Sequence, residues 1–221
     1  GYDQFTKTWN EESVKIALKA ANYSDKEIAV AGSVSTSGSW DKLSEEEIKP
    51  GFNEHLKILK EAGVDLIILE AMTSKDRTVE NIIECSKNVK LPIWLSISCA
   101  INEDENILMH GYQESITNSK AKFYDTLENS LSKFSKMHDG PILVAHSDIK
   151  VTSEAVKVLK QIHKGIVGAY PNNGYFEKPH WKLINDISPS KYLEEAKNWV
   201  SNGAQIIGGC CGVGPDKIEA V

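Results

Sequence analysis

The chain has 221 residues, of which 41% are hydrophobic and 25% are charged, and its formal net charge is −6. These proportions are typical of a globular protein and exclude a disordered or collagen-like chain. The acidic balance argues against non-specific nucleic-acid binding, and no apolar run approaches the ~20 residues that span a membrane. With four cysteines and no signal sequence, we expect reduced thiols and a cytoplasmic protein.

Six short apolar runs, each ending in small or polar residues, predict strands that are buried on both faces of a parallel sheet. They are residues 28–34, 66–71, 92–98, 141–147, 166–171 and 205–211. Helical spacing is found at residues 11–22, 54–61, 113–137, 152–163 and 190–202, and a last helix begins at Pro215. The alternation of strand and helix, six times over, predicts an α/β fold with a parallel sheet.

Two features favour a closed barrel over an open, doubly wound sheet. No glycine-rich dinucleotide fingerprint follows the first strand. Polar or reactive residues also fall at the carboxyl ends of the strands, namely Ser33, Glu70, Ser98, His146, Tyr170 and Cys210. Barrels build their sites at this edge; open sheets do so too, so this second feature is only suggestive. We predict a single (β/α)8 domain over residues 1–221. Because a barrel has eight strands, we expect it to be N-terminally incomplete by about two βα units, or ~60 residues.

The most specific motif is Gly208-Gly209-Cys210-Cys211-Gly212 at the end of the last strand. Thiolates are the preferred soft ligands of zinc, and the glycines allow a tight turn that presents both sulfurs to one point. Two alternatives stay open, namely small buried core residues or a backbone cradle for phosphate. We favour metal binding because a plain core strand does not need the glycines and a phosphate site does not need paired cysteines.

Two further residues end buried strands and are candidates for chemistry. Glu70 is either a structural acceptor or a ligand for a cationic group, and we favour the second interpretation. His146 is a candidate site residue, although a histidine there could equally be a hydrogen-bonded core residue. We interpret Cys85 and Cys99 as structural.

Together these motifs resemble the homocysteine S-methyltransferase family. The resemblance covers nearly the whole chain. It is carried by the GGCCG motif followed by Pro215, by Tyr170-Pro171-Asn172-Asn173-Gly174, by Leu69-Glu70, by Ala31-Gly32-Ser33 and by Trp94–Ser98.

The resemblance implies a barrel that binds one zinc ion through three cysteines, two of which match Cys210 and Cys211. The third belongs to an Asn-Cys pair where this chain has His146-Ser147, so it is absent here. We expect any zinc to be held by Cys210, Cys211 and His146, with Ser147 uncoordinated, if the strand end leaves its regular pleat. The family's glutamate that holds the substrate amino group matches Glu70, and the remaining expected substrate contacts are Ser33, Ser98, Tyr170 and Asn172.

The implied activity is methyl transfer from a sulfonium, ammonium or folate donor to the thiol of homocysteine, giving methionine. Zinc matters because it deprotonates a thiol whose pKa is near 8.5, and the thiolate is the nucleophile. Two thiolates and a neutral imidazole form a known catalytic set, but they leave the substrate sulfur less electron-rich than three thiolates. Two alternatives stay open: a zinc-free relative that binds an amino-acid-like ligand without methyl transfer, and a non-catalytic barrel. We expect no nucleic-acid or membrane partner.

Overall fold

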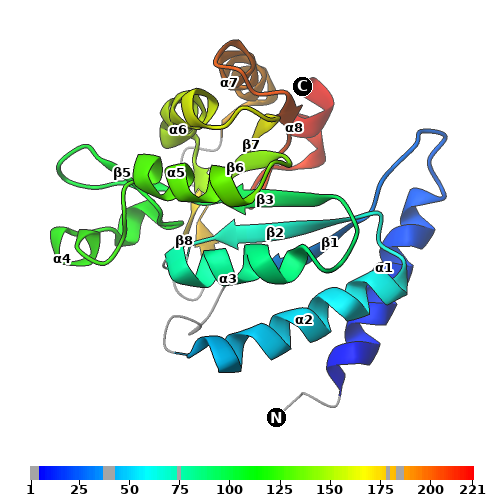
Figure 1. The fold of residues 1–221 in the computed structure, drawn as a ribbon. Helices are drawn as coiled ribbons and strands as arrows, with labels where there is room; N and C mark the ends of the chain where they lie inside the picture. Colours follow the sequence, from blue (N-terminus) through cyan, green and yellow to red (C-terminus); the bar gives the residue numbers. More distant parts are fainter. Residues whose placement is uncertain (1–4, 37–42, 74–75, 178–179, 183–186) are drawn as a thin grey trace.

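The computed structural model describes residues 5–36, 43–73, 76–177, 180–182 and 187–221. Six strands form one parallel sheet in the order β1-β2-β3-β6-β7-β10, which is also their order along the chain (Figure 1). These strands are β1 (Ala31–Ser35), β2 (Leu66–Met72), β3 (Ile93–Ile97), β6 (Ile142–Asp148), β7 (Val167–Asn172) and β10 (Ile206–Ile207). Because all six run the same way, their carboxyl ends meet at one edge of the sheet.

Helices connect the strands and pack against one another in chain order, and Figure 1 shows them as an arc around the strands. They are α1 (Thr6–Ala21), α2 (Glu45–Ala62), α3 (Asp76–Ser86), the short α4 (Asn118–Ala121), α5 (Leu127–Met137), α6 (Ile149–Ile162), α7 (Pro189–Ser201) and α8 (Pro215–Ala220). Among the described residues, no helix is both long and apolar enough to cross a membrane.

The hydrophobic core lies between the sheet and this arc of helices. Its largest fully buried side chains include Trp199, Tyr192 and Phe134, which project from the helices, and Ile67 and Leu95 from the sheet. Tyr192 and Trp199 pack edge to face with ring centroids 5.5 Å apart. Each buried side chain of this size contributes about 1.5–3 kcal/mol, so the core fixes the strands and thereby the edge that carries the polar residues.

The structure confirms the α/β fold, which is of the (β/α)8-barrel type, and all six predicted strands. Within the described part of the chain the sheet is not closed, since β1 and β10 are its two edge strands. The strand predicted over 205–211 is shorter than expected and covers only Ile206–Ile207, because the glycines that follow form a turn.

One helix prediction was wrong. Residues 113–137 do not form one helix but a 3-10 turn (Gln113–Ser115) followed by α4 and α5. Thr117 and Thr126 start the two helices, and each side-chain oxygen accepts a hydrogen bond from a backbone N–H three residues on. Two antiparallel hairpins were not predicted. They are β4 (Ala100–Ile101) with β5 (Ile107–Leu108), and β8 (Tyr175–Glu177) with β9 (His180–Lys182).

Candidate active site

Two strands are irregular where they reach the carboxyl edge of the sheet. The β2–β3 pairing shifts register between Leu69 and Met72, and the β6–β7 pairing shifts between Ala145 and Asp148. Within each shift one non-glycine residue has a positive φ, +50° at Ala71 and +47° at His146. Such bulges re-aim side chains and cluster near functional sites, because the strain persists only where the surrounding structure enforces it.

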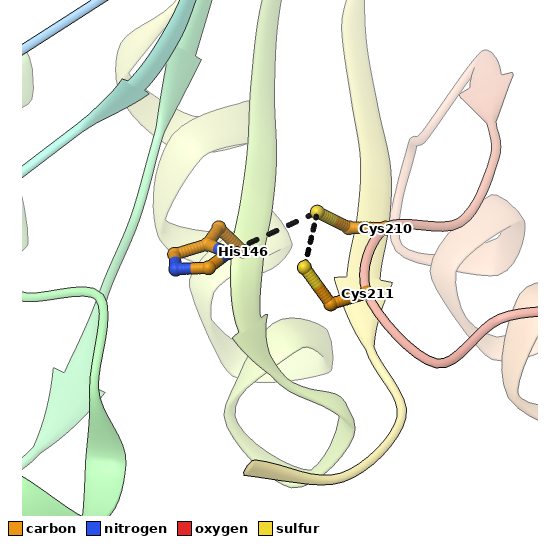
Figure 2. A group of neighbouring side chains, drawn as sticks. All are labelled: His146, Cys210 and Cys211. Carbon is orange, nitrogen blue, oxygen red and sulfur yellow. Dashed lines mark hydrogen bonds between the residues drawn. The ribbon is translucent and has the colours of Figure 1, made fainter. Parts of the chain in front are cut away.

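The bulge in β6 turns His146 toward the paired cysteines. The Nδ1 atom of His146 lies 3.8 Å from the Sγ atom of Cys210, and the two sulfur atoms of Cys210 and Cys211 also lie 3.8 Å apart (Figure 2). All three donor atoms lie within 4.8 Å of one another and are half-buried, a group that could hold a metal ion. A regular strand would have pointed His146 the other way, so the positive φ is what brings the three together.

The turn that carries the cysteines depends on two of its glycines. A Cβ atom at Gly209 would lie 2.2 Å from Cγ1 of Val213, and Gly212 has a φ of +77°. The turn is also tied to the end of β7: the backbone N–H of Cys210 donates to the carbonyl of Pro171, and the N–H of Asn173 donates to the carbonyl of Cys211. The two motifs 208–212 and 170–174 therefore form one rigid unit.

Ser147, next to His146, is fully buried. Its hydroxyl donates to the carbonyl of Ala145 at 2.7 Å and accepts from the backbone N–H of Cys99 at 2.9 Å. The Sγ atom of Cys99 lies 3.5 Å from the same hydroxyl, and burial raises the pKa of this thiol to about 12. Ser147 and Cys99 thus join β6 to the end of β3, as two buried structural residues.

The two neighbouring thiols ionise unequally. The hydrogen bond from Cys210, followed by the one from His146, lowers the pKa of Cys211. The same contact with Cys211, together with burial, raises the pKa of Cys210. One thiolate therefore forms readily, whereas a second needs a compensating positive charge because two like charges 3.8 Å apart repel each other.

Glu70 belongs to a second group of polar side chains in the same site. Its carboxylate accepts hydrogen bonds from the hydroxyl of Tyr170 at 2.7 Å and from that of Ser96 at 3.3 Å, and the two hydroxyls also contact each other. Burial raises the pKa of Glu70, whereas these hydrogen bonds and the charge of His146 lower it. The electrostatic effect of His146 on Glu70 indicates that the two groups lie in one site.

The other residues predicted to contact substrate differ in position. Ser98 and Asn172 are buried at the ends of β3 and β7, and the Oγ atom of Ser98 and the Oδ1 atom of Asn172 have no hydrogen-bond partner within the described structure. Ser33 lies in the middle of edge strand β1, where its side chain is exposed and it pairs with Ile68. Thus the structure brings together the polar ends of β2, β3, β6 and β7 with the cysteine turn, whereas Ser33 lies further back along its strand.

Two residues of the site were missed in the sequence. Ser96 lies in β3 (Ile93–Ile97), two positions before Ser98. Because side chains alternate between the faces of a strand, this spacing puts both serines on one face and could have identified Ser96. Tyr112 packs edge to face against His146, with ring centroids 5.3 Å apart. It belongs to the excursion between β3 and α5, and nothing in the local pattern indicates where that segment folds back.

A separate hollow of about 520 Å³ lies at the opposite end of the sheet, where Pro92 and Pro141 precede strands β3 and β6. Its one histidine, His138, is hydrogen-bonded to the carbonyl of Pro141, and burial lowers the pKa of His138. In barrel folds the amino-terminal end of the strands serves stability and the carboxyl end carries sites. The cysteine turn and Glu70, at the carboxyl end, are therefore the candidate site.

The sequence model of the family described as homocysteine S-methyltransferase matches residues 1–221. Among curated proteins, homocysteine S-methyltransferase 2 of Zea mays is 26% identical over 99% of this chain and 62% of its own length. Homocysteine S-methyltransferase 3 of Zea mays is 27% identical over 84% of the chain, and the selenocysteine methyltransferase of Astragalus bisulcatus 21% over 88%. The chain spans 52% and 58% of these two relatives.

Solved structures show the same fold. The metallated form of the homocysteine methyltransferase MmuM from Escherichia coli superposes with a TM-score of 0.70 at 20% sequence identity, covering 97% of this chain and 69% of that one. Its apo form gives a TM-score of 0.69. Because the family model matches every residue of this chain, the chain belongs to the homocysteine S-methyltransferase family.

Proposed function

We propose that the protein transfers a methyl group from a small sulfonium, ammonium or folate donor to the thiol of homocysteine, giving methionine. The observation that carries this proposal is the convergence of Cys210, Cys211 and His146 beside the half-buried Glu70. The first group offers soft donors for a metal ion, and the second offers a carboxylate for the amino group of an amino acid. Both are needed to hold homocysteine by its two ends.

The donor group fits zinc. In a tetrahedral zinc site with bonds of about 2.3 Å to sulfur and about 2.0 Å to nitrogen, the ligand atoms lie about 3.5–3.8 Å apart. The sulfur–sulfur and sulfur–nitrogen distances here are both 3.8 Å. Two cysteines and one histidine also form a catalytic ligand set that leaves the fourth position open. Zinc held by these three residues would supply a positive charge that lowers the pKa of a substrate thiol, so that the thiolate would be available as the nucleophile.

The residues of the chain itself bind and orient the substrate. The carboxylate of Glu70 binds the substrate ammonium group, and the hydroxyls of Tyr170 and Ser96 hold the two carboxylate oxygens in place. Burial makes this charge pair strong, because an ionised Glu70 without a partner is costly at this position. The unpartnered side-chain oxygens of Ser98 and Asn172 offer further hydrogen bonds to the substrate.

A second candidate function is suggested by the residue at position 147. The serine there is occupied by its bonds to Cys99 and Ala145, so among the residues that the structure describes two thiols, those of Cys210 and Cys211, are placed to coordinate a metal here. A relative with this ligand set could bind an amino-acid-like ligand without transferring a methyl group. The two candidates share Glu70 and differ in whether the thiol is activated.

The test uses calorimetric titration of homocysteine into zinc-loaded and zinc-depleted protein, followed by a methyl-transfer assay with each of the three donor classes. We expect binding that depends on zinc and transfer from one donor class. Homoserine, which has a hydroxyl in place of the thiol, is the matched control and should bind equally with and without zinc. Binding of homocysteine that ignores zinc, with no transfer from any donor, would support the second candidate and contradict the first.

A further inference from the structure

The imidazole of His146 must be held in an unusual place. Its backbone is in the left-handed region, and its Nδ1 atom lies 3.8 Å from the Sγ atom of Cys210. A histidine that binds a metal needs contacts on the rest of its ring to fix its orientation, and outer contacts of this kind typically change metal affinity by about 10–100-fold. The question is therefore which groups hold the far side of this ring.

One contact comes from the backbone of Gly111. A Cβ atom at this position would lie 3.1 Å from Cδ2 of His146, 2.8 Å from Cγ2 of Thr73 and 3.3 Å from Cβ of Ser98. The main chain at Gly111 therefore passes directly against the edge of the imidazole that points away from the thiols. Only a residue without a side chain allows this approach.

The next residue supplies the second contact. The ring of Tyr112 stands at 87° to that of His146 with centroids 5.3 Å apart, an edge-to-face arrangement. Tyr112 is 40% exposed, so this ring lies at the surface of the molecule.

Tyr112 is itself braced from behind. It packs edge to face against His110, whose ring stacks on Tyr124 with centroids 4.7 Å apart and whose Nε2 atom lies 3.2 Å from the hydroxyl of Ser115. Burial lowers the pKa of His110 to about 4, so this ring is neutral at pH 7 and packs against Tyr112 and Tyr124 as an uncharged ring. The contacts form a chain from Tyr124 to the candidate ligand.

We propose that Gly111 and Tyr112 are positioning residues that hold the imidazole of His146 toward Cys210 and Cys211. This inference rests on the metal centre proposed above and adds a role for the excursion between β3 and α5, which is not part of the sheet. Through these contacts the excursion sets the direction of the third ligand, and so the metal affinity of the site.

A double-mutant cycle tests the inference, with zinc affinity measured by chelator competition. Tyr112→Ala should weaken zinc binding about 10-fold, whereas Tyr112→Phe keeps the ring and should change it by less than about twofold. In a His146→Ala background, Tyr112→Ala should cause no further loss, because its effect passes through the imidazole. Tyr23→Ala, at a side chain that is 79% exposed, is the matched control and should have no effect. An equal loss in both backgrounds, or no loss in either, would overturn the proposal.

A metal-free measurement separates this inference from the proposed function. In NMR spectra of zinc-depleted protein, the ring current of Tyr112 shifts the imidazole protons of His146, so Tyr112→Ala should move these signals and Tyr23→Ala should not. Gly111→Ala should move them as well, because its Cβ would lie 3.1 Å from Cδ2 of the imidazole and displace the ring. Unmoved signals would refute the positioning role. If instead the signals move but the wild-type protein binds no zinc, the proposed function fails while the contact stands.

Discussion

Replacing Ser147 with alanine should lower stability without changing metal affinity. The hydroxyl is fully buried, and it is the acceptor for the backbone N–H of Cys99 and a donor to the carbonyl of Ala145. Alanine leaves this N–H without its acceptor in a place that water does not reach, which costs about 1–3 kcal/mol. For a domain of this size each kcal/mol lowers the melting temperature by about 2–4 °C, so we expect a loss of about 2–12 °C.

The assay is urea and thermal unfolding of zinc-depleted protein, together with zinc affinity. Ser13→Ala is the matched control, because its hydroxyl bonds to a backbone carbonyl on the exposed side of α1 and its loss should change stability by less than about 0.5 kcal/mol. Ser147→Cys should likewise not tighten zinc, since the new thiol faces Cys99. If Ser147→Ala keeps full stability but loses zinc, the hydroxyl is a ligand and the conformation described for β6 is wrong.

Two further predictions concern Glu70. Glu70→Ala should weaken homocysteine binding by at least two orders of magnitude in calorimetry, since removing one partner of a desolvated ion pair costs about 3–5 kcal/mol, and its zinc content should stay unchanged. Glu154→Ala, at an exposed carboxylate, is the control and should bind homocysteine as the wild type does. Unaltered binding in Glu70→Ala would make the carboxylate structural. Burial raises the pKa of Glu70, so the folded state loses stability as pH rises from the ordinary carboxyl pKa through the raised one. Glu70→Gln cannot ionise, and its melting temperature should gain on the wild type across that window and level off above it; a difference that does not depend on pH would contradict the shift.

The strands and most helices follow from local pattern, because continuous apolar runs and helical spacing record burial directly. The prediction of a single helix over 113–137 was wrong because Thr117 and Thr126 cap the beginnings of two separate helices. In the sequence, a threonine that caps a helix cannot be told from a threonine on the exposed face of a continuous helix. The packing of Tyr112 on His146 was equally out of reach, since the path of the excursion is set by tertiary contacts.

The candidate site could be foreseen as a set of residues but not as a geometry. The cysteine pair and Glu70 follow from their positions at strand ends. The direction of His146 depends on a φ of +47° and on a register shift in β6, and neither leaves a mark in the sequence. On a regular strand Ser147 would point toward the thiols and His146 would point to the opposite face of the sheet. The bulge in β6 therefore decides which of the two side chains meets the thiols.

X-ray absorption at the zinc edge tests the central claim most directly, namely that Cys210, Cys211 and His146 hold a zinc ion whose open position takes the thiol of homocysteine. For the zinc-loaded protein the account predicts two sulfur ligands at about 2.3 Å and at least one nitrogen ligand at about 2.0 Å. Adding homocysteine should raise the number of sulfur ligands from two to three, whereas homoserine should leave it at two. A sulfur count that homocysteine does not change, or three protein sulfurs before it is added, would contradict the account.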